Sequence, residues 1–197
     1  MIISGKAKKR PPHKTIAEVF QLEVKLDGVK PAVWRRIAVS SEITLLRVHK
    51  ILQVVMGWAD SHLHQFIIND QHYSIPYEDK GPGEIDERHI KLNRVIHKVG
   101  ETFKYVYDFG DDWVHIIRVE QIGAPDPNIR YPHCSAGKRA CPPEDVGGPF
   151  GYKEFLEALA DSNHEDYQRF LGWIGGHFDP NEFDIDEINE SLRTKRL

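Results

Sequence analysis

Apolar and polar residues alternate with a period of two on both sides of one short turn. The alternating set comprises Phe103, Tyr105, Tyr107 and Phe109 before the turn, and Trp113, His115, Ile117 and Val119 after it. This period is typical of β-strands, because successive side chains point to opposite faces. Gly110 can supply the positive φ that a tight turn needs. The pattern therefore predicts an antiparallel hairpin with strands at 103–109 and 113–122.

The same alternation predicts two further pairs of strands. Residues 18–26 and 33–39 read as strands on either side of a turn at 27–31, and pair most simply as an antiparallel hairpin. Within the second strand, Arg35 and Arg36 must point to opposite faces. Residues 58–68 and 72–75 form the next pair. In this pair His62, His64 and Phe66 are expected to share one strand face.

Helical spacing appears between and after these strands. Residues 45–56 repeat apolar positions every three or four residues, with Thr44 as N-cap and Gly57 at the C-terminal end. Residues 92–96 predict a single helical turn. Further helices are predicted near 152–159, across 166–174 and after Asp184, where Glu187 completes a capping box and Phe183 contacts Ile188 as a hydrophobic staple. Residues 76–88 are expected to form a surface loop, and 130–149 to lack a regular element because of their Pro and Gly content.

The order of elements predicts an α+β fold. We expect a roll-like, mainly antiparallel sheet with one packed helix and a C-terminal helical extension. We divide the chain into a flexible basic tail at 1–14, a roll core at 15–125, and a loop with helices at 126–197 packed on that core, as one domain overall.

Composition excludes several classes of protein. The chain has 197 residues, 40% hydrophobic and 28% charged, and a formal net charge of −4, which argues against disorder. No apolar run approaches the roughly 20 residues that span a bilayer, so no membrane association is expected. The N-terminus lacks the apolar stretch of a signal peptide, and we therefore expect a cytoplasmic protein. The basic residues of the 1–14 tail leave phosphate binding open.

The central hairpin carries the most chemistry. Its turn is expected to bring Asp108, Asp111, Asp112 and His115 to one corner, which we call the Asp/His corner, together with His62 and His64. These are ligand types for a divalent metal, which could activate water for hydrolysis. The alternative is that the carboxylates accept backbone N–H bonds within the turn and the histidines form ordinary hydrogen bonds.

Two other sets of residues are weaker candidates. Cys134 and Cys141 are too few for a disulfide scaffold, and their wide spacing is a poor match to a zinc site. Arg35 and Arg36, with neighbouring aromatic residues, could contact nucleic acid or another anion. The ordinary interpretation leaves one arginine in solvent and pairs the other with an acidic residue such as Asp108.

Several segments together resemble one family. They are 31–36 (PAVWRR), 57–66 (GWADSHLHQF), 105–111 (YVYDFGD), 141–149 (CPPEDVGGP) and 178–184 (FDPNEFD). They resemble the open-reading-frame-three-like proteins first noticed on the agrobacterial root-inducing plasmid, over about residues 18–190. The resemblance implies an α+β roll-like fold without an established activity; a transposon-resolvase label carried by some members finds no support in these residues. The chain departs from the family pattern at Val146, where many relatives have a cysteine, and at Val114, where an acidic residue is usual.

These observations lead to two hypotheses of function. The favoured one is a cytoplasmic binding or adaptor module with an unknown protein or nucleic-acid partner, in the context of mobile elements. The alternative is a metal-dependent hydrolase or nuclease that uses the Asp/His corner. No cofactor is expected under the first hypothesis, and a divalent metal is required under the second.

Overall fold

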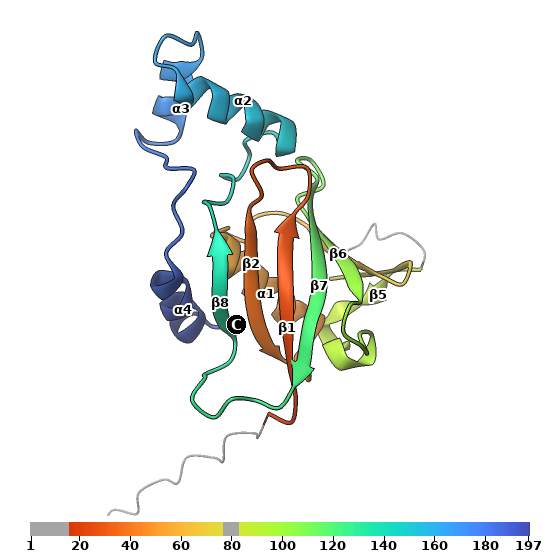
Figure 1. Cartoon of the computed structure of the whole chain (residues 1–197). Coiled ribbons are helices and arrows are strands. Elements are labelled where there is room, and N and C mark those ends of the chain that lie inside the picture. The colour runs from red at the N-terminus through yellow and green to blue at the C-terminus, as the bar shows by residue number, and fades with distance from the viewer. Residues whose placement is uncertain (1–15, 77–82) are drawn as a thin grey trace, which may run out of the picture.

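The computed structural model describes residues 16–76 and 83–197, and its strands form one sheet of eight. The tail predicted at 1–14 and part of the loop predicted at 76–88 lie outside the described residues. The strands are β1 (Val19–Leu26), β2 (Trp34–Ser40), β3 (His64–Ile68), β4 (Gln71–Ser74), β5 (Ile85–Asp86), β6 (Thr102–Tyr107), β7 (Trp113–Gly123) and β8 (His133–Lys138). Their order across the sheet is β5-β4-β3-β6-β7-β1-β2-β8 (Figure 1).

Pairing is antiparallel throughout, except that β4 and β5 are parallel. The two hairpins predicted most clearly, β1–β2 and β6–β7, both form. The structure thus confirms an α+β fold with a mainly antiparallel sheet.

Helix α1 (Leu45–Met56) covers one face of the sheet (Figure 1). It begins where predicted, because the Thr44 side chain accepts a hydrogen bond from the backbone N–H of Arg47. It ends at Gly57, whose φ of 80° is left-handed. The apolar side of α1 and one side of the central strands make the core, with Leu22, Val24 and Ile51 fully buried.

None of the helices in the described residues lies over the opposite face of the sheet (Figure 1). Along β1 and β2, buried residues alternate with partly exposed ones, so each strand has one apolar side and one side toward solvent. We call this uncovered side the open face.

Three helices follow the sheet in sequence. Helices α2 (Gly148–Ala160) and α3 (Tyr167–Trp173) lie beyond one end of the sheet, and α4 (Ile185–Thr194) lies beside β8 (Figure 1). Asp184 caps α4 as predicted, since its side chain accepts hydrogen bonds from the backbone N–H groups of Asp186 and Glu187. None of the helices in the described residues is both long and apolar enough to cross a lipid bilayer.

Two sequence predictions about loops were wrong. Residues 130–149 contain β8, which pairs with β2 at the edge of the sheet. Asn189 of α4 holds the other side of β8, donating to the backbone carbonyl of Cys134 and accepting from its N–H. These partners are distant in sequence, so local composition could not reveal the strand. Likewise, the predicted loop at 76–88 contains β5 and a 3-10 turn at Glu87–His89, which begins with Asp86 as its N-cap.

Candidate functional site

A row of side chains crosses five strands of the open face. Strand register pairs Lys138 with Trp34, Trp34 with Lys25, Lys25 with Ile116, and Ile116 with Lys104. Residues paired across neighbouring strands project from the same side of a sheet, so the five side chains stand next to one another. We call this set the cationic row. With about 4.8 Å between strands, its two outer lysines are about 19 Å apart along the sheet.

A second row lies beside the first. Register places Glu23 of β1 between Arg36 of β2 and Arg118 of β7. The Arg36 guanidinium donates to both carboxylate oxygens of Glu120, with an Nη2–Oε1 distance of 2.9 Å. This contact raises the pKa of Arg36 and lowers the pKa of Glu120, so both groups stay charged.

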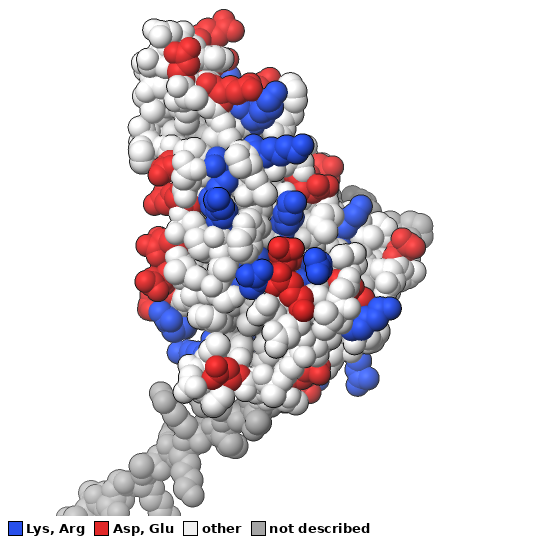
Figure 2. Space-filling view, in the orientation of Figure 1, with Lys and Arg blue, Asp and Glu red and all other residues white. Residues whose placement is uncertain are grey.

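The balance of charge on the open face is positive, although the whole chain is acidic. The cationic groups are Lys25, Arg36, Lys104, Arg118 and Lys138, against the carboxylates of Glu23 and Glu120. Figure 2 shows Lys and Arg side chains gathered around a smaller acidic patch on this face. The three lysines of the cationic row are exposed and form no ion pair with another described residue.

Trp34 lies in the middle of the cationic side chains. The Arg36 guanidinium carbon stands 5.4 Å from the centre of the indole ring, which is a cation–π distance. The indole is partly exposed, between Lys138 on one side and Lys25 on the other. An aromatic ring that lies among cations can stack on a planar group of a ligand, while the cations neutralise the negative charge of that ligand.

Arg35 points the other way and is 3% exposed. Its guanidinium donates to the backbone carbonyls of Val55, Trp34, Lys138 and Arg139 at 2.8–3.1 Å, and to the sulfur of Cys141 at 3.1 Å. The prediction that the two arginines face opposite sides is confirmed. The expected arrangement, with one arginine in solvent and the other on an acid such as Asp108, was wrong: Arg36 pairs with Glu120, and Arg35 joins α1 to the end of β8.

The predicted Asp/His corner is built mainly around the turn. The Asp108 carboxylate accepts hydrogen bonds from the backbone N–H groups of Gly110 and Asp111 at 3.0 and 3.4 Å. Positive φ angles occur at Asp108 (57°) and Asp112 (52°), and Gly110 does not have one. The expectation that Gly110 supplies the positive φ of the turn was therefore wrong. Two aspartates adopt it instead, because an aspartate tolerates the left-handed region when its side chain can bond to nearby backbone.

Asp111 connects this turn to the start of α2. Its carboxylate accepts a hydrogen bond from the Gly147 N–H at 3.1 Å. The backbones approach so closely that a Cβ on Gly148 would lie 2.4 Å from the Asp111 carbonyl oxygen. Asp111 thus has a structural partner outside the turn, whereas the alternative interpretation expected its donor within the turn; Asp108 meets that expectation.

The histidines of the predicted corner go to different places. His62 lies at the turn, with its ring nitrogens 3.7 Å from Asp108 and 3.3 Å from Asp145. His64 and His115 point into the core, 6% and 0% exposed. Burial lowers the pKa of His115 to about 4, and its Nδ1 faces the carbonyls of Tyr105 and Trp113. The structure therefore groups Asp108 with His62, but not with His64 or His115.

The two cysteines are free thiols. Burial raises the pKa of Cys134, and raises that of Cys141 to about 11, so both stay protonated at neutral pH. Neither belongs to a cluster of metal-ligand atoms in the described part of the chain.

Sequence reasoning missed residues that only long-range pairing brings together. Lys138 lies in a strand that composition assigned to a loop, and the cationic row exists only in the register of five strands. His49 and Asp60 were not singled out, because a histidine inside an amphipathic helix looks like any polar position. The spacing of Arg36 and Trp34 within one strand was the one signal of this face visible in the sequence.

Comparisons with known proteins place the chain among relatives without a described function. The model of the "Plasmid pRiA4b ORF-3-like protein" family matches residues 18–187. The uncharacterised protein y4hQ of Sinorhizobium fredii is 41% identical over 179 residues, which cover 90% of this chain and 92% of that protein. The crystal structure of the protein of unknown function MM3350 from Methanosarcina mazei Go1 superposes with a TM-score of 0.81 at 38% identity, covering 88% of this chain and 98% of that one.

Proposed function

We propose that this chain, which belongs to the plasmid pRiA4b ORF-3-like family, is a cytoplasmic module that binds single-stranded nucleic acid across its open face. The observation that carries the proposal is the cationic row, in which Trp34 stands between Lys138 and Lys25 on adjacent strands. The name of the family comes from a plasmid, and we infer a role in the context of mobile elements from that alone.

The charge and length of the row suit a nucleic-acid backbone. Its span of about 19 Å matches five or six phosphate intervals of about 3.4 Å along one stacked strand. Lys25, Lys104 and Lys138 form no ion pair with another described residue, so their contacts with phosphates would not first require an internal ion pair to break. Arg36 stays charged but is occupied by Glu120, and we expect it to orient Trp34 rather than to bind a phosphate.

The shape of the face favours an unpaired strand over a duplex. Reading a duplex through its major groove needs a protruding helix or ribbon, and the described part of the chain places neither on the open face (Figure 1). An unpaired base exposes its flat side, which can stack on an indole, and sheets with exposed aromatic residues bind single strands in this way.

A charge-matched comparison tests the proposal. Binding of dye-labelled mixed-sequence single-stranded DNA and RNA is measured by fluorescence anisotropy for the wild type and for two triple variants. Changing Lys25, Lys104 and Lys138 to Gln should weaken binding at about 50 mM salt by at least about tenfold. Changing Lys98, Lys153 and Lys195 to Gln alters the net charge equally, away from the open face, and should change affinity by less than about threefold. Equal affinities for the two triple variants, or no saturable binding by the wild type, would refute the proposal.

A metal-dependent hydrolase or nuclease at the Asp/His corner is the second candidate function. The observation that favours it is the group of His62, Asp108 and Asp145, whose ligand atoms lie within 4.8 Å of one another. We expect oligonucleotide cleavage with Mg²⁺ or Mn²⁺ to be lost in an Asp145→Asn variant, because Asp145 is exposed and its change leaves the turn intact. Cleavage that is absent in the wild type, or unchanged in this variant, would exclude the enzyme.

A further inference from the structure

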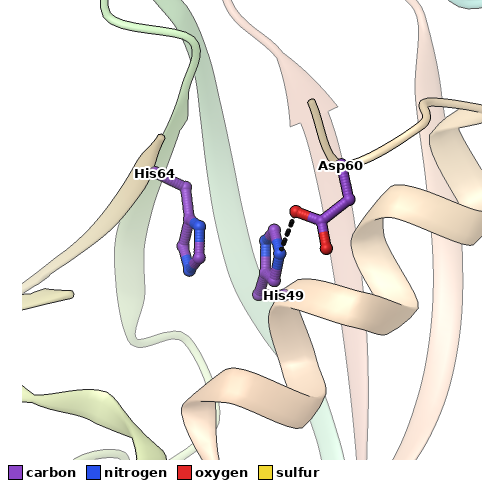
Figure 3. Close-up of side chains that lie close together, drawn as sticks. All are labelled: His49, Asp60 and His64. Atoms are coloured by element: carbon purple, nitrogen blue, oxygen red, sulfur yellow. Dashed lines mark hydrogen bonds and ion pairs between the residues drawn. The ribbon is translucent and has the colours of Figure 1, made fainter. Parts of the chain in front are cut away.

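A second cluster of ligand-type side chains lies on the covered side of the sheet. It consists of His49 from α1, Asp60 from the loop after α1 and His64 from the start of β3 (Figure 3). One ligand atom from each of the three lies within 4.8 Å of the other two. The two histidines are buried, whereas about half of the Asp60 side chain is exposed, so the cluster is open to solvent at its carboxylate end.

Each histidine is oriented by a partner outside the cluster. His64 Nε2 lies 2.9 Å from a carboxylate oxygen of Glu87, which leaves Nδ1 as the ring nitrogen available to a ligand. His49 Nδ1 lies 2.7 Å from the hydroxyl of Tyr105, while its Nε2 lies 2.8 Å from Asp60. Histidines that bind a metal are commonly held in this way, with the second ring nitrogen on a carboxylate or another polar group.

Glu87 provides an independent observation. It is fully buried, and its second carboxylate oxygen has no hydrogen-bond partner among the described residues. A buried carboxylate with one free oxygen is costly unless a positive charge is near. A cation bound to Nδ1 of His64 would supply that charge, because the Nε2 of the same ring contacts the Glu87 carboxylate.

We propose that His49, Asp60 and His64 form a binding site for a transition-metal dication of the Zn²⁺ class, with Glu87 and Tyr105 as its outer shell. Two imidazoles and one carboxylate are a donor set that zinc uses when one position is left for water. This site shares no residue with the open face and goes beyond the proposed nucleic-acid function.

Metal binding requires two local changes. Neutral His49 can move its ring proton from Nε2 to Nδ1, so that Nε2 binds the ion and Nδ1–H donates to Tyr105. The rings of His49 and His64 are stacked, with centres 3.5 Å apart and planes 3° from parallel. Because a coordinated ion lies close to the plane of each ring, binding must also open this stack.

The test uses tag-free protein treated with a chelator, titrated with Zn²⁺ by calorimetry and with Co²⁺ by optical spectroscopy. We expect one ion per chain at the cluster. Asp60→Asn should weaken Zn²⁺ binding by more than about 100-fold, and Glu87→Gln by about 10–100-fold, the usual effect of losing an outer-shell partner.

Asp70→Asn is the matched control. Asp60 and Asp70 both have left-handed backbones, with φ of 59° and 60°, so the two changes make the same demand on the backbone. Asp70 is exposed in the β3–β4 turn and should bind Zn²⁺ as the wild type does. The proposal is wrong if the wild type takes up no stoichiometric Zn²⁺, or if Asp60→Asn binds as tightly as Asp70→Asn. Loss of Zn²⁺ in Asp145→Asn instead would assign the ion to His62 and also overturn it.

Discussion

Replacement of Arg35 with Met tests whether this buried arginine stabilises the fold by joining α1 to the end of β8. The substitution keeps an unbranched apolar stem but removes all the N–H donors of a side chain that is 3% exposed. Four backbone carbonyl groups, one buried and three partly buried, then lose their charge-assisted partner, those of Trp34, Val55, Lys138 and Arg139.

The expected loss of stability follows from these bonds. A hydrogen bond to a charged group contributes about 1.5–3 kcal/mol, so four give a gross effect of about 6–12 kcal/mol. Removing the guanidinium also removes its desolvation cost of several kcal/mol. We therefore expect Arg35→Met to lower the free energy of unfolding by about 3–5 kcal/mol, a large part of the 5–15 kcal/mol typical of a domain.

Urea denaturation followed by circular dichroism measures this difference. Arg36→Met is the control, because it makes the same change one residue later on the opposite face. Its partly exposed ion pair with Glu120 should contribute no more than about 1 kcal/mol. A change of less than about 1 kcal/mol for Arg35→Met, or a larger loss for Arg36→Met, would refute the role assigned to Arg35.

Three further predictions follow from other residues. Trp34→Ala should weaken single-strand binding about 5- to 150-fold in the anisotropy assay, the equivalent of about 1–3 kcal/mol for one stacked base, with little change in the melting temperature. Because burial lowers the pKa of His115 from 6.5 to about 4, the unfolded chain takes up a proton at this residue before the folded chain does as the pH falls. Urea titrations between pH 6.5 and 4 should therefore show a loss of stability, of which up to about 3 kcal/mol comes from His115 and is absent in His115→Phe. Asp184→Ala should cost about 1 kcal/mol through loss of two hydrogen bonds at the start of α4, and an unchanged melting curve would contradict this.

Local patterns predicted the elements that depend on local physics. The two clear hairpins, α1 with its Thr44 cap, and the Asp184 cap of α4 all follow from periodicity and capping preferences. The missed elements, β5 and β8, are the edge strands of the sheet: β8 pairs with β2, far away in the chain, and β5 is a strand of two residues that pairs with β4. Composition around β8 is rich in Pro and Gly, and only its pairing with β2 makes it regular.

The candidate sites show the same division. The sequence placed Asp108 and Asp111 in one turn and His115 on the strand face of Trp113 and Ile117, but it could not show that this face would be buried and separate His115 from the turn. Whether a histidine in a strand points to the turn or to the core depends on which face the rest of the fold covers. Likewise, Lys138 becomes a neighbour of Trp34 only after β8 joins the sheet.

The salt dependence of single-strand binding tests the central claim most directly. If the four cations of the open face other than Arg36 neutralise phosphates, the logarithm of the association constant should fall with the logarithm of salt concentration with a slope of about −2.8. Between 50 and 200 mM salt, affinity should then fall about 50-fold for the wild type, and only about 3-fold for the variant with Gln at Lys25, Lys104 and Lys138. The same slope for both proteins would contradict the account, because it would show that nucleic acid does not bind on this face.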